Sequence, residues 1–185
     1  MSRRAREGAK PLVLLAFLSS AALAQAPPLL DQLLAALKVA PSEDIAANLE
    51  QRIREAWLNA GSPAVTLLMS RGLRDAQAGA QQEAEADFDA AIVLDPNLAE
   101  AYDRRAVTRF QQGDYAGAVR DIEEALKREP RDFIALQDLS RIAESRHDWA
   151  GAYAAWQKVL ELDPKTPGGE MRLNELRRHA EGEGI

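Results

Sequence analysis

Residues 99–130 read AEAYDRRAVTRFQQGDYAGAVRDIEEALKREP, and this stretch determines the expected fold. It contains two segments of helix-forming composition, 99–112 and 115–128, which are separated by Gly113-Asp114. The glycine suits the end of the first helix, and the aspartate side chain can cap the start of the second. Pro130 lacks the backbone N–H that a continuing helix needs, so the second helix must end before it. The stretch therefore predicts a pair of antiparallel helices.

The pair recurs with a period of 34 residues, once before and once after this stretch. One helix pair cannot bury its apolar face alone, so neighbouring pairs must stack, and about three are needed for a stable array. Six columns of the sequence keep the period without insertion or deletion: Asp95-Pro96, Glu129-Pro130 and Asp163-Pro164; Ala84, Ala118 and Ala152; Phe88, Ile122 and Trp156; Ala91, Ala125 and Val159; Leu68, Tyr102 and Leu136; and Gly72, Ala106 and Ser140.

Residues 65–164 resemble three consecutive tetratricopeptide repeats, because each copy carries this succession of large, small and apolar residues and a closing proline. The resemblance implies an all-α fold, a short right-handed superhelical solenoid of antiparallel helix pairs with helical caps at both ends. The chain departs from the family at two positions. The tyrosine usual late in the first helix is replaced by Asp75, Arg109 and Ala143. The turn glycine becomes His147 in the last copy, so we expect this histidine to adopt a left-handed backbone conformation.

Two flanking segments complete the expected organisation. The N-terminal one is interpreted as a degenerate repeat that caps the array, because 29–39 and 43–60 are both amphipathic at helical spacing. The alternative, an independent helical hairpin, would leave its own apolar face uncovered. The predicted boundaries are 1–24 for a signal peptide, 25–64 for the N-terminal helix pair, 65–98, 99–132 and 133–166 for the three repeats, and 167–185 for a C-terminal capping helix with a frayed tail.

The first 24 residues have the composition of a secretory signal. Arg3, Arg4, Arg6 and Lys10 make the start positive, an apolar run of 14 residues follows at 11–24, and Ala22-Leu23-Ala24 is a small-residue cleavage site. The run is shorter than the about 20 apolar residues of a membrane-spanning helix. We expect cleavage after Ala24, no integral membrane span after cleavage, and export to the periplasm of a Gram-negative bacterium. An uncleaved membrane anchor is the alternative.

The composition excludes several classes of function. The 185 residues include no cysteine, which excludes disulfides, thiolate metal sites and cysteine nucleophiles. Of the 23 basic and 29 acidic residues, four basic and one acidic lie in 1–24, so the remainder carries a net charge of −9. A surface this acidic repels phosphate backbones, so we expect no nucleic-acid partner.

The sequence contains no pattern typical of a catalytic or cofactor site. His147 and His179 belong to no HExxH helix, serine triad or metal-ligand cluster. The carboxylates of the second helices are expected on a solvated outer face. These carboxylates are Asp87, Asp89, Asp121, Glu123 and Glu124. We therefore expect no enzyme, no cofactor and no bound metal.

The resemblance implies that the first helix of each repeat lines a concave groove in which a partner binds. Helical spacing of three, four and three residues selects the stripe that faces this groove. Some members of the family use lysines and asparagines there to clamp a partner's C-terminal carboxylate, but these positions hold other residue types, so that activity is not expected. The candidate groove residues are Met69, Leu73, Asp103, Val107, Phe110, Gln137 and Arg141, and the same stripes include Thr66, Ala76, Glu100, Ile134 and Glu144.

The expected function is that of an exported scaffold or adaptor, which holds a peptide segment or helix of another protein in the assembly or regulation of a cell-envelope complex. A fold alone does not specify function, and two alternatives stay open. One is a structural protein that self-associates through its terminal helices, and the other is an accessory subunit of an enzyme. Phe110 likewise has two interpretations, an exposed anchor for the partner or a core residue in place of the missing tyrosine.

Overall fold

The computed structural model describes residues 28–182, and within this range the chain forms nine α-helices and no strand. The predicted signal peptide and the end of the C-terminal tail lie outside the described residues. The helices are α1 (Leu29–Lys38), α2 (Glu43–Leu58), α3 (Pro63–Gln77), α4 (Gln81–Leu94), α5 (Ala99–Gln111), α6 (Tyr115–Arg128), α7 (Phe133–Ser145), α8 (Trp149–Leu162) and α9 (Gly169–Ala180).

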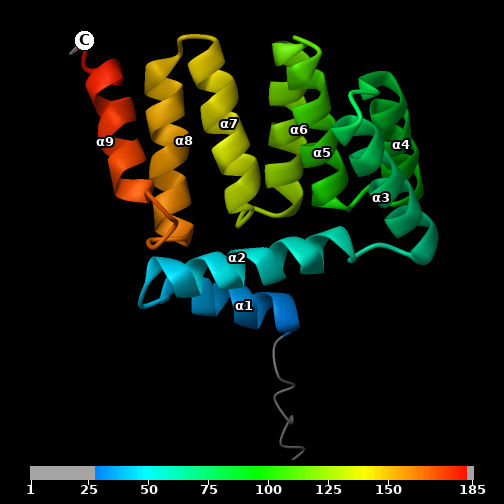
Figure 1. The fold of residues 1–185 in the computed structure, drawn as a ribbon, viewed down its shortest axis with the longest axis horizontal. Coiled ribbons are helices and arrows are strands. Elements are labelled where there is room, and N and C mark those ends of the chain that lie inside the picture. Colours follow the sequence, from blue (N-terminus) through cyan, green and yellow to red (C-terminus); the bar gives the residue numbers. More distant parts are fainter. Residues whose placement is uncertain (1–27, 183–185) are drawn as a thin grey trace, which may run out of the picture.

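Helices α3 to α9 stand side by side as a row of antiparallel pairs (Figure 1). The pairs are α3 with α4, α5 with α6, and α7 with α8, and α9 packs against α8 at the end of the row. The predicted all-helical solenoid of helix pairs is confirmed. Each pair has its own apolar cluster, and the recurring small residues Ala84, Ala118 and Ala152 are completely buried where the helices approach each other.

The turns inside the pairs have the local structure that the repeat pattern predicts. Gly79, Gly113 and His147 occupy the same place in the three turns, with φ angles of 80°, 84° and 58°. The left-handed conformation predicted for His147 is therefore confirmed. The Asp114 carboxylate accepts a hydrogen bond of 2.9 Å from the Gly117 N–H, which caps α6 as expected, and Asp148 caps α8 through Gly151 in the same way.

The N-terminal helix pair takes a position that the sequence did not indicate. Helices α1 and α2 lie across the ends of α5 to α8 and do not stack on α3 as a preceding repeat would (Figure 1). The apolar face of α2 is buried against the start of α7, where the Trp57 and Phe133 rings lie 5.6 Å apart. Two polar contacts continue this interface, from Thr166 to Glu50 at 3.2 Å and from Arg131 to Asp31 at 2.7 Å. The pair caps the edge of the array, because its apolar stripe meets Phe133 and Ile134 there.

Candidate functional site

Two of the seven predicted groove residues lie in the interior of the array. Met69 and Asp103 are both 0% exposed. Met69 packs inside the first repeat, in the same cluster as Phe88 and Ala84. Met69 lies one turn before Leu73 on the same face of α3, but at that level the face is covered by the cluster, so its side chain is core. Neither residue presents a surface to a partner in this structure.

Leu73 and Val107 come together on the adjacent first helices α3 and α5. They line a cavity of about 240 Å³ between α3 and α5, and both are half-buried. Four of its eight lining residues are apolar and four are polar. The remaining lining residues are Ala76, Gln77, Phe88, Arg104, Thr108 and Gln111. The cavity is wide enough for an aliphatic or aromatic side chain and is formed by the helices that the family resemblance assigned to the groove.

Phe110 and Arg141 form a second contact on the same side, between α5 and α7. The Arg141 guanidinium lies 5.4 Å from the centroid of the Phe110 ring, a cation–π distance, and it also pairs with Asp138 at 2.7 Å. The other side of Phe110 lies 5.6 Å from the Tyr115 ring and packs on the core of the second repeat. Phe110 is thus half-buried, so it is neither the fully exposed anchor nor the fully buried core residue that the sequence allowed. Gln137 is half-buried on α7.

The N-terminal helices close one end of this stripe. Ile134, at the start of α7, is only 5% exposed because it belongs to the apolar cluster under α1 and α2. Glu100, at the start of α5, is also buried. The part that stays accessible is the C-terminal half of the first helices, and we define the open groove as Leu73, Ala76, Val107, Phe110 and Arg141.

A buried group of carboxylates lies beneath the closed end. Neither carboxylate oxygen of Asp103 has a hydrogen-bond partner among residues 28–182. Burial raises the pKa of Asp103 well above its usual value, and the charges of Asp138, Asp132 and Glu100 raise it further. Burial also raises the pKa of Asp132 to about 7, although this carboxylate accepts backbone hydrogen bonds at the start of α7. The closed end therefore favours protonated carboxyl groups.

A profile of the tetratricopeptide repeat matches residues 99–132. A TPR repeat-containing protein of Rhizobium etli is 32% identical over 147 residues, which cover 80% of this chain and 72% of that protein. The chain belongs to the tetratricopeptide repeat family.

Solved tetratricopeptide repeat structures share the fold. The first TPR domain of Spaghetti (RPAP3), bound to the HSP90 peptide SRMEEVD, has a TM-score of 0.61 at 19% identity and covers 65% of this chain and 96% of its own. The Sgt2 TPR domain from Aspergillus fumigatus has a TM-score of 0.61 at 21% identity, over 66% of this chain and 84% of its own. None of these relatives has a name that describes a catalytic activity.

Arginine–aspartate bridges join the two helices of the first and second tetratricopeptide repeats. Arg71 of α3 donates to Asp87 of α4, and Arg105 of α5 donates to Asp121 of α6 at 2.6 Å. Asp87 and Asp121 are buried, so the predicted solvated face is wrong for these two carboxylates. A buried charge is tolerated when a well-placed partner compensates the lost hydration, and here the arginines supply it. The signal in the sequence was the recurrence of both residues after 34 positions.

Arg109 replaces the tyrosine that the repeat family usually has late in the first helix. Its guanidinium bridges two second helices, with 2.7 Å to Glu85 of α4 and 2.8 Å to Asp121 of α6. The contact between the first two repeats is therefore polar at this point. In the third repeat, Leu139 and Ala155 stand where the second has Arg105 and Asp121, so the bridge is replaced there by apolar residues.

Between residues 28 and 182, no group of three or more histidine, aspartate or glutamate side chains is arranged to hold a metal ion. In the same range no helix is both long and apolar enough to span a bilayer.

Proposed function

We propose that this protein is an exported scaffold that holds a segment of a partner protein in the open groove. The observation that carries the proposal is the cavity formed by Leu73 and Val107 between two first helices, beside the exposed edge of Phe110. In the related Spaghetti domain the array was solved with a bound peptide, and that domain shares the arrangement of helix pairs. A partner segment with one apolar side chain for the cavity and a second over Phe110 fits this surface.

The export part of the proposal rests on the composition of residues 1–24. A basic start, an apolar run of 14 residues and Ala22-Leu23-Ala24 are typical of a cleaved secretory signal. Export would place the array in the cell envelope, where assembling or regulating a complex is the corresponding role. N-terminal sequencing of the protein from an envelope fraction should begin at Gln25, and a full-length product in the cytosol would contradict export.

Site-specific photo-crosslinking tests the groove. A photoreactive amino acid at Val107 should crosslink a partner segment in the native envelope, and mass spectrometry of the crosslinked peptide identifies it. The matched control carries the same amino acid at Glu123, which is exposed on a second helix. Equal crosslinking to the same segment from both positions would mean that the groove does not select the partner.

Truncation of the anchors gives a quantitative test with the partner so identified. Removing a buried interface anchor costs about 2 kcal/mol or more, so Leu73→Ala and Phe110→Ala should each weaken binding at least about tenfold. Both side chains also pack against the core of their own repeat, so the unfolding free energy of each variant should be measured beside its affinity. Unchanged affinity in both variants would place the partner elsewhere.

A second candidate function, self-association, is favoured by one observation. Ala101 and Ala135 are buried where α5 and α7 contact the preceding repeat. Leu67 occupies the same position of the first repeat and is 67% exposed, because α1 and α2 do not cover it. Sedimentation velocity at increasing concentration tests this possibility. If arrays stack end to end, the sedimentation coefficient should rise with concentration, and Leu67→Glu should abolish the rise.

A further inference from the structure

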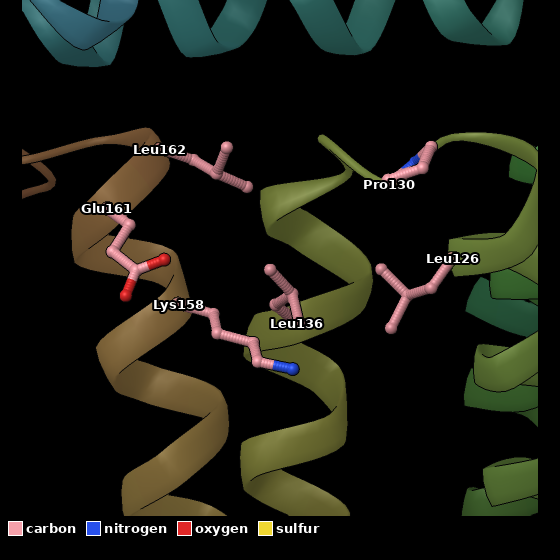
Figure 2. A pocket seen from close by; sticks show the side chains of 6 residues that line it. All are labelled: Leu126, Pro130, Leu136, Lys158, Glu161 and Leu162. Atoms are coloured by element: carbon pink, nitrogen blue, oxygen red, sulfur yellow. The ribbon is translucent and has the colours of Figure 1, made fainter.

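A separate cavity of about 300 Å³ lies between the C-terminal ends of α6 and α8, on the side of the second helices (Figure 2). Leu126 and Leu162 point toward each other across α7, and the buried Leu136 forms the floor. The full lining consists of Leu126, Pro130, Leu136, Lys158, Glu161 and Leu162, of which Lys158 and Glu161 are exposed at the rim. The open groove, in contrast, is built from first helices.

The repeat period identifies the residues that fill the same place one repeat earlier. Each lining residue has a counterpart 34 positions before it, and these are Ile92, Pro96, Tyr102, Glu124, Lys127 and Arg128. At that junction the Arg128 guanidinium lies 4.0 Å from the centroid of the Tyr102 ring. The Tyr102 hydroxyl donates to the Pro96 carbonyl at 3.2 Å, and Arg128 Nε donates to the same oxygen at 2.5 Å.

Two replacements open the cavity at the second junction. Leu136 stands in place of Tyr102, and Leu162 in place of Arg128, so both the phenol ring and the guanidinium are missing. Their hydrogen-bonding target remains, because Pro130 corresponds to Pro96. Leu136 and Leu162 cannot donate a hydrogen bond to the Pro130 carbonyl, whereas Tyr102 and Arg128 both donate to the Pro96 carbonyl. The second junction is thus an apolar cavity that retains the acceptor and lacks the donor.

We propose that this cavity binds a tyrosine side chain of a partner protein. The ring packs among the three leucines, in the place that Tyr102 fills at the first junction, and the hydroxyl donates to the Pro130 carbonyl. Aromatic rings suit such a wall, since they bury a large apolar area and need one polar partner for the hydroxyl. Among the apolar side chains, tyrosine satisfies both the leucine wall and the carbonyl.

The shape of the site favours a side chain of a larger partner over a free small molecule. Small-molecule sites usually surround most of the ligand, and 300 Å³ is at the lower end of their volumes. Here six residues line the cavity, and two of them are exposed charges at its rim. A tyrosine that projects from a protein segment can place its ring inside while its backbone stays over Lys158 and Glu161.

Methyl NMR of the full chain, labelled at its leucine and isoleucine methyl groups, tests the proposal with N-acetyltyrosinamide as the probe. The methyl signals of Leu126, Leu136 and Leu162 should shift in a saturable way, and those of Leu73 should stay unchanged. N-acetylphenylalaninamide, which lacks the hydroxyl, should bind several-fold more weakly. The filled variant Leu136→Tyr/Leu162→Arg restores the residues of the first junction, so it should fold stably and bind the probe at least tenfold more weakly.

The reverse exchange tests the proposal even if the filled variant does not fold. Tyr102→Leu/Arg128→Leu removes the ring and guanidinium at the first junction and should create a second site next to Pro96, detected as new shifts of the Ile92 methyl groups. The proposal is overturned if saturating N-acetyltyrosinamide moves none of the three leucine signals, if the filled variant folds and binds it unchanged, or if the phenylalanine analogue binds equally well. Binding of p-cresol without binding of N-acetyltyrosinamide would assign the cavity to a small phenol and overturn the protein partner.

Discussion

Removing the carboxylate of Asp121 should reveal how strongly the ion pairs of the second repeat depend on each other. Asp121 accepts from Arg105 at 2.6 and 2.9 Å and from Arg109 at 2.8 Å, and its side chain is only 4% exposed. Asp121→Ala leaves two guanidinium groups in a largely buried site, with side-chain exposures of 16% and 22%. Breaking a buried pair in this way costs about 3 to 5 kcal/mol. Asp89 and Glu85 still contact the arginines, so we expect the lower end, about 3 kcal/mol.

The third repeat supplies the compensating change, since it has Leu139 and Ala155 at the corresponding positions. Arg105→Leu/Asp121→Ala copies that pair and removes the buried carboxylate together with Arg105, while Arg109 keeps its contact with Glu85. The double variant should therefore regain about 2 kcal/mol relative to Asp121→Ala alone, because an apolar replacement of a buried ion pair is close to neutral. Urea unfolding followed by circular dichroism measures both free energies. A double variant no more stable than Asp121→Ala would refute the bridge as the reason for burying this carboxylate.

Three further predictions concern the packing, the turns and the buried carboxyl groups. Ala118→Leu should destabilise the array by about 1 to 3 kcal/mol in a denaturant melt, because Ala118 is completely buried between helices, whereas the exposed Glu123→Ala should change little; equal effects would contradict the register. His147→Gly should raise the free energy of unfolding by about 1 kcal/mol, since glycine adopts the left-handed conformation without the Cβ penalty, and Gly113→Ala should lower it by a similar amount; no difference would remove strain from this turn. The raised pKa of Asp103 means that the native state keeps this proton to a higher pH than the unfolded chain, whose aspartates titrate near about 3.9. Stability should therefore fall as the pH rises above about 4, and Asp103→Asn should reduce this slope and raise the melting temperature at pH 7; an unchanged slope would show that Asp103 is not the titrating group.

The period in the sequence was enough to predict the helix pairs, their turns and the residues at their closest approach. Each of these depends on neighbours within one repeat, so a recurring alanine or glycine carries the information. The placement of Leu73 and Val107 on adjacent first helices came from the same local geometry, whereas the cavity that they line is a finding of the structure. Met69, one turn before Leu73 on the same face of α3, is buried in the cluster with Phe88, and helical spacing alone does not show which turns of that face are covered.

Contacts between distant segments were the part that sequence patterns could not supply. The amphipathic stripe of α2 indicated that one face is buried, but it carried no information about which surface covers it. The acidic residues on the second helices were expected to be exposed to solvent, because charged residues usually are. The pairing of Asp87 with Arg71 joins two different helices, so the pattern within one helix did not show it. Phe110 could not be assigned either, since its neighbours Tyr115 and Arg141 come from two other helices.

The N-terminal helix pair changes how this array should unfold and fold. In an open solenoid each repeat touches only its neighbours, so the ends fray independently and folding can spread from any point. Here the contacts of Asp31 with Arg131 and of Glu50 with Thr166 span 100 and 116 residues, and they attach helices α1 and α2 to the last repeat. We expect one cooperative unfolding transition instead of stepwise fraying. During synthesis α1 and α2 cannot make these contacts until most of the chain has been translated. The docking of α1 and α2 onto the last repeat should therefore be the slow step of folding.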